Sequence, residues 1–196
     1  MIWPYSRGTR TRTAPAHLDA WLPPGALELE RHTLTVPADP ATTLTAIDEV
    51  RWRDLPLVRV LFTLRGLPHE AQGSIRQFFS TPPFVELEAV PGREVVFAVL
   101  GPFWRWGRGS VPPRVARTPA ELRQALADGA MAALGSYGVE AAASGTVLWT
   151  ETWVHAPRPA QRAAFLAYWL VVGPFSAWIR RLMLRAARRR AAPSGA

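Results

Sequence analysis

The chain of 196 residues contains no cysteine, no lysine and no asparagine. The absence of cysteine excludes a disulfide scaffold, a thiolate-ligated zinc or iron–sulfur site and a cysteine nucleophile. With 48% hydrophobic and 19% charged residues, the composition is that of a globular protein long enough to bury a core without covalent or metal cross-links.

Acidic residues are absent from the last 45 positions. Residues 1–151 contain 15 arginines and all 15 acidic residues, whereas residues 152–196 contain eight arginines and no acid. The whole formal net charge of +8 therefore lies in residues 152–196. Such a concentration of arginine suggests a solvated, cationic end or a surface that meets an anionic partner.

Long apolar runs are also scarce. The N-terminus has no apolar segment of the kind found in signal peptides, so we expect a cytoplasmic protein. The longest uncharged apolar stretch has 17 residues, between Arg162 and Arg180, and Gly173-Pro174 interrupts it. This length is at the lower edge for a membrane span. We expect a helix that covers a core instead, and a peripheral association with a membrane remains open.

Alternating and helical patterns predict the elements of the first half. Residues 1–26 read as an irregular arm with one helical turn near residues 18–22, and residues 27–36 read as a strand with His32 on its apolar face. Asp39-Pro40 begins a helix that runs to about residue 50. A second helix begins at residues 54–56, with a buried stripe formed by Leu57, Val58, Leu61 and Phe62.

The second half contains two predicted hairpins, a short helix and a long helix. In chain order these elements cover residues 84–90, 93–100, 119–127, 131–140, 146–155 and 159 to about 190. Pro91-Gly92 and Ser144-Gly145 form the hairpin turns, and Gly173-Pro174 is expected to kink the long helix. A strand, two short helices, antiparallel strands and a final helix predict an α+β fold.

Several short segments, taken in order, resemble one superfamily. They are Leu29–Val36, Asp54–Pro68, Pro91–Glu94, Gly101–Trp104, Thr150–Thr152 and parts of Tyr168–Leu184. In these segments the chain resembles the SRPBCC, or START-like, superfamily, which has polyketide-cyclase-like and lipid-transfer members, and it looks most like an uncharacterised bacterial branch. The resemblance spans roughly residues 17–190.

The resemblance implies a helix-grip fold, in which a curled antiparallel sheet wraps around a long C-terminal helix and leaves an apolar cavity between them. It implies a single START-like domain over residues 27–192, preceded by the arm and followed by a disordered tail over 193–196. Members of the superfamily bind lipids, sterols, polyketides or hormones in this cavity, and a few catalyse cyclisation.

The last predicted strand carries two pairs of candidate residues. Alternation places Thr150 and Thr152 on one face and Trp149 and Trp153 on the other. The resemblance favours the first face as the cavity wall, where the hydroxyl groups would orient a ligand. Alternatively, the two threonines are β-branched strand residues that simply pack well. The tryptophans would form an exposed interaction patch unless another segment covers them.

His32 and Tyr137 are the other polar candidates. His32 would orient a ligand, act as a general base or be a satisfied core histidine, and the sequence offers no orienting partner for it. Tyr137 alternates with Gly135 and Val139, so its small neighbour leaves room for either a ligand or the tyrosine ring itself.

The leading hypothesis is a protein that binds a hydrophobic or lipid-like small molecule between the sheet and the last helix. The predicted ligand-binding residues are His32, Tyr137, Thr150, Thr152, Phe165, Trp169, Val172 and Met183. The alternatives are a polyketide cyclase-like enzyme with His32 as its base, and a peripheral membrane or protein-interaction module. We expect a binding protein rather than an enzyme, and no catalytic residue is assigned.

The arginines Arg181, Arg185 and Arg188 share one stripe of the last predicted helix. They form either a solvated helix end or, together with the two tryptophans, a surface for anionic lipid head groups or a protein partner. Nucleic acid is not an expected partner, because no base-reading motif accompanies the charge. The run Phe103–Arg108 is expected to cap the mouth of the cavity.

No metal or cofactor is expected. The four histidines are far apart and on different predicted elements, without the spacing of metal ligands. Neither a glycine-rich phosphate loop nor a nucleophile elbow occurs in the sequence.

Overall fold

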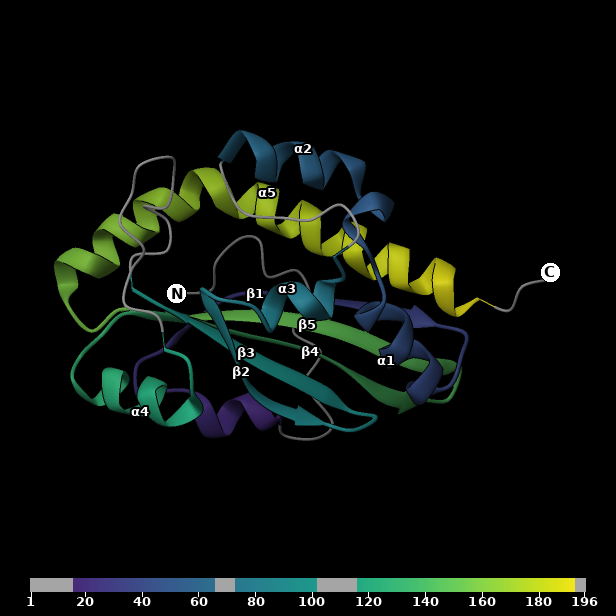
Figure 1. The fold of residues 1–196 in the computed structure, drawn as a ribbon, viewed down its shortest axis with the longest axis horizontal. Helices are drawn as coiled ribbons and strands as arrows, with labels where there is room; N and C mark the ends of the chain where they lie inside the picture. Colours follow the sequence, from purple (N-terminus) through teal and green to yellow (C-terminus); the bar gives the residue numbers. More distant parts are fainter. Residues whose placement is uncertain (1–15, 66–72, 102–115, 193–196) are drawn as a thin grey trace.

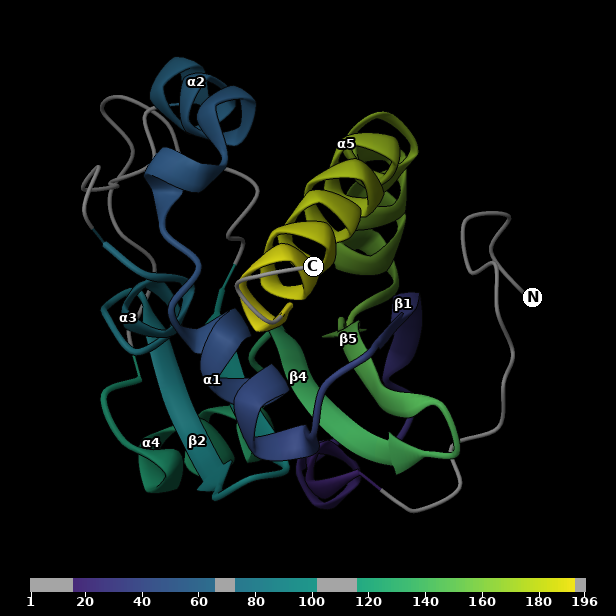
Figure 2. The ribbon, with the colours of Figure 1, turned by 90° about the vertical axis from the view of Figure 1, so that its right-hand side faces the viewer.

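The computed structural model describes residues 16–65, 73–101 and 116–192. These residues form an α+β structure, in which a five-stranded antiparallel sheet carries helices on both faces (Figures 1 and 2). The strand order is β1–β5–β4–β3–β2. The curled sheet and the long C-terminal helix are consistent with a helix-grip fold. The expected cap at Phe103–Arg108 lies outside the described residues.

The elements follow the predicted order. The strands are β1 (Leu27–Val36), β2 (Phe84–Val90), β3 (Glu94–Leu100), β4 (Ala132–Ala142) and β5 (Gly145–His155). The helices are α1 (Pro40–Asp48), α2 (Pro56–Arg65), α3 (Ile75–Phe79), α4 (Pro119–Ala127) and α5 (Pro159–Ala191), with 3-10 turns η1 (His17–Trp21) and η2 (Trp52–Asp54). Both hairpins and the long helix are confirmed, whereas α3 is too short to show a helical period and was not predicted.

Polar side chains cap the start of two helices, α1 as predicted from Asp39-Pro40 and α4 through Thr118, which was not predicted. Asp39 accepts a hydrogen bond from the backbone nitrogen of Thr42 at 2.9 Å, and a bond from the Thr42 hydroxyl lowers the pKa of Asp39. Thr118 accepts a bond from the backbone nitrogen of Glu121 at the start of α4. A proline follows each cap, where its missing N–H leaves no helical bond unmade.

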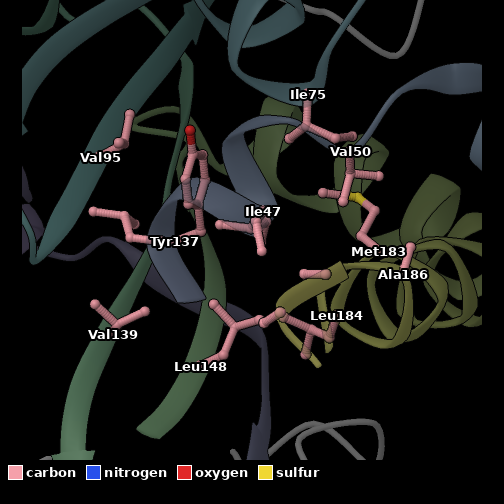
Figure 3. Packing of buried hydrophobic residues seen from close by; sticks show 14 of the residues in the cluster. Ile47, Val50, Ile75, Val95, Tyr137, Val139, Leu148, Met183, Leu184 and Ala186 are labelled. Atoms are coloured by element: carbon pink, nitrogen blue, oxygen red, sulfur yellow. The ribbon is translucent and has the colours of Figure 1, made fainter. Parts of the chain in front are cut away.

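The face of the sheet towards α5 carries the largest apolar cluster. Tyr137 of β4 and Leu148 of β5 pack there with Ile47 of α1 and Met183 of α5 (Figure 3). Short apolar residues near the end of α5 let the helix approach α1 closely; they include Ala186 and its neighbours in the cluster. The second half of α5 is therefore held as an ordinary core helix.

The opposite face of the sheet is covered as well. The turn η1 and helix α4 lie on that side in Figure 1, and their apolar residues pack against the same cluster as Trp149. Trp149 is 5% exposed, and Trp153 packs against this cluster. The prediction of an exposed tryptophan pair is therefore wrong. Arg31 lies over the Trp149 ring, with its guanidinium carbon 5.8 Å from the ring centroid.

A buried carboxylate on β3 holds η1 against the sheet. Glu94 is fully buried and accepts hydrogen bonds from the backbone nitrogens of His17 at 2.7 Å and Leu18 at 3.4 Å. Glu88 on β2 binds two side chains of the same turn, His17 through Nδ1 at 3.0 Å and Trp21 through Nε1 at 3.2 Å. Residues 16–21 are thus part of the packed structure.

The helices on the α5 side expose some apolar residues, and one of them, Leu57, was predicted to be buried. Val58 of α2 is fully buried as predicted, but Leu57 is 59% exposed. Leu61 and Phe62 lie outside the residues whose side chains are described. On α5, which contains Pro174 and changes direction along its length in Figure 1, Phe175 is 53% exposed.

Candidate functional site: a buried polar site beneath the C-terminal helix

Charged and hydroxyl side chains lie buried between the sheet and the middle of α5. We call this group the buried polar site: Glu30 and His32 of β1, Thr150 of β5, and Ser176 and Arg180 of α5. Glu30 is 1% exposed, His32 7% and the side chain of Arg180 11%. Before and after the site, α5 packs through apolar side chains. Charges buried this deeply are stable only with partners.

Glu30 is the centre of the site. Its Oε2 atom lies 3.0 Å from Nε2 of His32, and its Oε1 atom accepts a hydrogen bond from Oγ of Ser176 at 2.5 Å. The same Oε1 atom lies 3.6 Å from Nε of Arg180. One carboxylate therefore meets a histidine, a hydroxyl and a guanidinium away from water.

Arg180 links the carboxylate on β1 to a hydroxyl on β5. Its Nη1 donates to Oγ1 of Thr150 at 2.5 Å, and Oγ1 of Thr150 donates to the carbonyl oxygen of Ser136 at 3.1 Å. Burial lowers the pKa of Arg180, while the charges of Glu30 and Glu151 act in the opposite direction. The Glu30–Arg180 pair thus compensates two charges that would be costly if buried alone.

A β-bulge in β1 places Glu30 and its neighbour on the same face. Glu28 and Glu30 pair with consecutive residues of β5, so Leu29 is the extra residue. Leu29 is 3% exposed and packs beneath the first half of α5, although strict alternation would turn it to the opposite face from Glu30. Glu30 remains on the face of His32.

The sequence predicted His32 and Thr150 for this face but missed their partners. The interpretation that His32 has no orienting partner is wrong, because Glu30 provides one. The available signal was that Glu30 and His32 are two residues apart on one strand, which places them on the same face. Arg180, next to the basic end of the helix, was not predicted to be buried. Its position three residues before Met183, on the buried stripe, was the signal that it points inward.

Two buried polar atoms near this site have no hydrogen-bond partner among the described residues: Oγ1 of Thr152 and Nε1 of Trp169. Thr152 pairs with Glu30 across the two strands, and Trp169 packs in the same cluster as Leu29. A Cβ atom at Gly173 would lie 3.0 Å from the Trp169 nitrogen, so the indole uses space that a side chain at that position would need. These atoms mark where a polar group could bind.

The remaining predicted ligand residues divide between the two halves of α5. Phe165 and Trp169 lie together beneath the first half, with ring centroids 5.8 Å apart, and Val172 beside them in sequence is half-buried. Tyr137 and Met183 belong to the packed core beneath the second half (Figure 3). Phe165 and Trp169 therefore belong to a different apolar cluster from Tyr137 and Met183.

Tyr137 is a core residue with a satisfied hydroxyl. The space left by Gly135, next to Tyr137 on this face of β4, is filled by the ring of Phe97. A Cβ atom at Gly135 would lie 2.8 Å from that ring. Phe97 in turn stacks on Phe79 with centroids 3.8 Å apart. The hydroxyl of Tyr137 donates to Oδ1 of Asp48 at 2.5 Å. Burial raises the pKa of Asp48 and, together with the nearby Asp48 charge, raises the pKa of Tyr137.

Replacing Tyr137 with phenylalanine should lower the free energy of unfolding at neutral pH by about 1.5–3 kcal/mol, the range for hydrogen bonds to charged groups. The folded state holds the phenol neutral, so its contribution is present below the unfolded pKa of about 10 and is lost as the pH rises above it. Denaturant unfolding at several pH values from 7 upward should therefore show the gap between the wild type and Tyr137→Phe narrowing above about pH 10. A constant gap would contradict this assignment.

The arginines Arg181, Arg185 and Arg188 are exposed on α5. Among the described residues, no group of three or more histidine, aspartate or glutamate side chains could hold a metal ion.

Comparison with known proteins places the chain near no established family. No protein-family model matches it, and no curated protein matches it. The X-ray crystal structure of protein MLL2253 from Mesorhizobium loti is similar over 87% of this chain and 99% of that chain, with 10% sequence identity and a TM-score of 0.38. A TM-score this low does not establish a shared fold, so what the site can do must follow from this chain's own residues.

Proposed function

We propose that the protein is a START-like binding module for an amphipathic small molecule, held between the sheet and the first half of α5. The observation that carries the proposal is the pair of buried, unpartnered atoms, Oγ1 of Thr152 and Nε1 of Trp169. Each such group costs about 1–3 kcal/mol when it is left without a partner. Ligand oxygens that bond these two atoms would recover this cost, while the apolar part of the ligand would pack against Phe165 and Leu29.

The chemistry of the site favours a neutral oxygen as the polar group of the ligand. An indole N–H can only donate, whereas a threonine hydroxyl can donate or accept. The charge of Arg180 is already compensated by Glu30 within the site. A carbonyl or hydroxyl group therefore fits better than a carboxylate, which would add an uncompensated buried charge. The curled sheet and long helix support the START-like assignment.

Two threonines on one strand provide a matched test. Thr152→Val removes an unpartnered hydroxyl, so it should leave the free energy of unfolding unchanged or raise it by up to about 1 kcal/mol. Thr150→Val removes a hydroxyl that bonds Arg180 and Ser136, so it should lower the free energy of unfolding by about 1–3 kcal/mol. Urea unfolding of the two variants measures this. An equal decrease in the free energy of unfolding of both variants would show that the Thr152 hydroxyl already has a hydrogen-bond partner in the unliganded protein.

Binding is measured with two probes that share an acyl chain, monoolein with neutral oxygens and oleate with a carboxylate. Isothermal titration should show tighter binding of monoolein, weakened about fivefold in Thr152→Val and in Trp169→Phe, since one hydrogen bond contributes about 1 kcal/mol. Val147→Ala, a half-buried position on the other face of β5, serves as the control and should not change binding. If neither probe binds, or both variants bind like the wild type, the proposal fails.

One observation favours a second function. The Glu30–His32 pair has the arrangement of an oriented general base, with Nε2 held by the carboxylate and Nδ1 left for a substrate proton. We propose proton abstraction from an activated carbon, as in polyketide cyclisation. Deuterium exchange at the central carbon of pentane-2,4-dione, followed by NMR, should be accelerated by the wild type and not by His32→Gln. Equal rates would exclude His32 as a base.

A further inference from the structure

The most exposed large hydrophobic residues belong to two helices that lie on the same side of the sheet. Within the described residues, the large hydrophobic side chains that are more than half exposed are Leu57 and Val60 of α2, and Leu170, Val171 and Phe175 of α5. Figures 1 and 2 both show α2 and α5 over the same face of the sheet. We call the exposed side of these two helices the outer helix face. Apolar surface gathered in this way commonly marks an interaction site.

The outer face of α5 changes from apolar to cationic along one stripe. Positions 170, 174, 181, 185 and 188 recur at steps of three, four and seven residues, so they share one side of the helix. Arg181, Arg185, Arg188 and Arg189 are exposed there and form no ion pair with the described residues. In contrast, Arg190 is paired with Glu49 at 3.2 Å and with Asp54 at 3.5 Å. The helix itself contains no acidic residue.

We propose that the outer helix face binds the surface of an anionic lipid bilayer. Apolar side chains combined with unpaired arginines are the composition of helices that lie in the membrane interface. Each arginine near an anionic surface adds attraction, and nothing on this helix opposes it. This commits to a membrane rather than to a protein, because the free charges of α5 are all of one sign.

The helix should lie on the membrane without crossing it. By length and composition α5 could span a bilayer, and 22% of its most apolar window is buried. However, its inner stripe carries Arg180, which is paired with Glu30 beneath the helix. Crossing a bilayer would separate this pair and leave both charges without compensation. The sheet therefore holds α5 at the surface with its outer face free.

Flotation with vesicles tests the proposal. The wild type should bind vesicles of phosphatidylcholine with phosphatidylglycerol, bind vesicles of phosphatidylcholine alone much more weakly, and dissociate at high salt. Arg185→Gln with Arg188→Gln should weaken partitioning about 30-fold. Arg117→Gln with Arg123→Gln, at the α4 side of the sheet, removes the same charge and should have little effect. Equal binding to both vesicle types, or equal losses in the two double variants, would overturn the proposal.

The absence of cysteine permits a direct measurement of insertion. A single cysteine introduced by Val171→Cys and labelled with bimane should show a blue shift on anionic vesicles, because the label enters the apolar interface. Ala127→Cys, exposed on α4, should show none. If the labelled variants melt at the wild-type temperature and the bimane emission shifts at neither position, the proposal is refuted. Concentration-dependent dimerisation lost in Phe175→Ser, with vesicle binding retained, would assign the face to a second copy instead.

Discussion

Replacement of Arg180 by methionine should lower the free energy of unfolding by about 3–5 kcal/mol, because it leaves the buried carboxylate of Glu30 without its charged partner. Methionine keeps most of the apolar volume, so packing changes little. The neighbouring Arg181→Met is the matched control. Arg181 is exposed, and its replacement should change the free energy of unfolding by less than about 0.5 kcal/mol.

The double variant Glu30→Met with Arg180→Met decides whether the loss comes from the broken pair. The double variant no longer contains the buried Glu30 carboxylate that Arg180→Met leaves without its partner, so it should be more stable than Arg180→Met alone. Urea unfolding of the wild type, Glu30→Met, Arg180→Met and the double variant gives the coupling energy between the two side chains. Losses that simply add would mean that the two side chains act independently, contrary to the 3.6 Å separation of Nε and Oε1.

Replacement of Glu94 by leucine should lower the free energy of unfolding by a similar amount, about 3–5 kcal/mol. Two backbone N–H groups, that of the buried Leu18 and that of the half-buried His17, each lose a partner at about 1–3 kcal/mol. Hydrogen exchange should show the amides of His17 and Leu18 protected in the wild type and exchanging fast in the variant. Glu88→Leu removes the half-exposed carboxylate that binds the same turn through side chains. It should cost about 1 kcal/mol and leave those amides protected.

If Glu88→Leu releases η1 as completely as Glu94→Leu does, the anchoring role of Glu94 is wrong. If neither variant changes the exchange of these amides, the turn is held by apolar packing of residues such as Leu18, which is fully buried. Both carboxylates bind the same five-residue turn, but the buried Glu94 binds its backbone and the half-exposed Glu88 binds its side chains.

The elements could be predicted from the sequence because their signals are local. The Asp39-Pro40 start, the Pro91-Gly92 turn and the alternation of β5 each depend on residues a few positions apart, and all three are confirmed. The two faces of β5 were also correctly separated, with Leu148 in the α5 cluster and Trp149 in the opposite one.

The segments that cover each face of the sheet, and the polar side chains buried beneath them, could not be predicted in the same way. Trp149 is covered by η1 and α4, and no pattern within β5 reveals segments that arrive from elsewhere in the chain. The bulge at Leu29 depends on the pairing with β5. The burial of Arg180 depends on a carboxylate 150 positions earlier, so its sequence neighbours suggested an exposed basic end instead.

The strand order has a consequence for the time at which the polar site forms. Strands β2 to β5 are joined to their neighbours by antiparallel pairing in chain order, whereas β1 pairs with β5, the last strand made. Loop closure over such a separation is slow compared with hairpin formation. On a ribosome, Glu30 would leave the exit tunnel long before Arg180 is synthesised. The carboxylate must therefore stay hydrated until the final helix emerges, and the ion pair closes the protein as one of its last folding events.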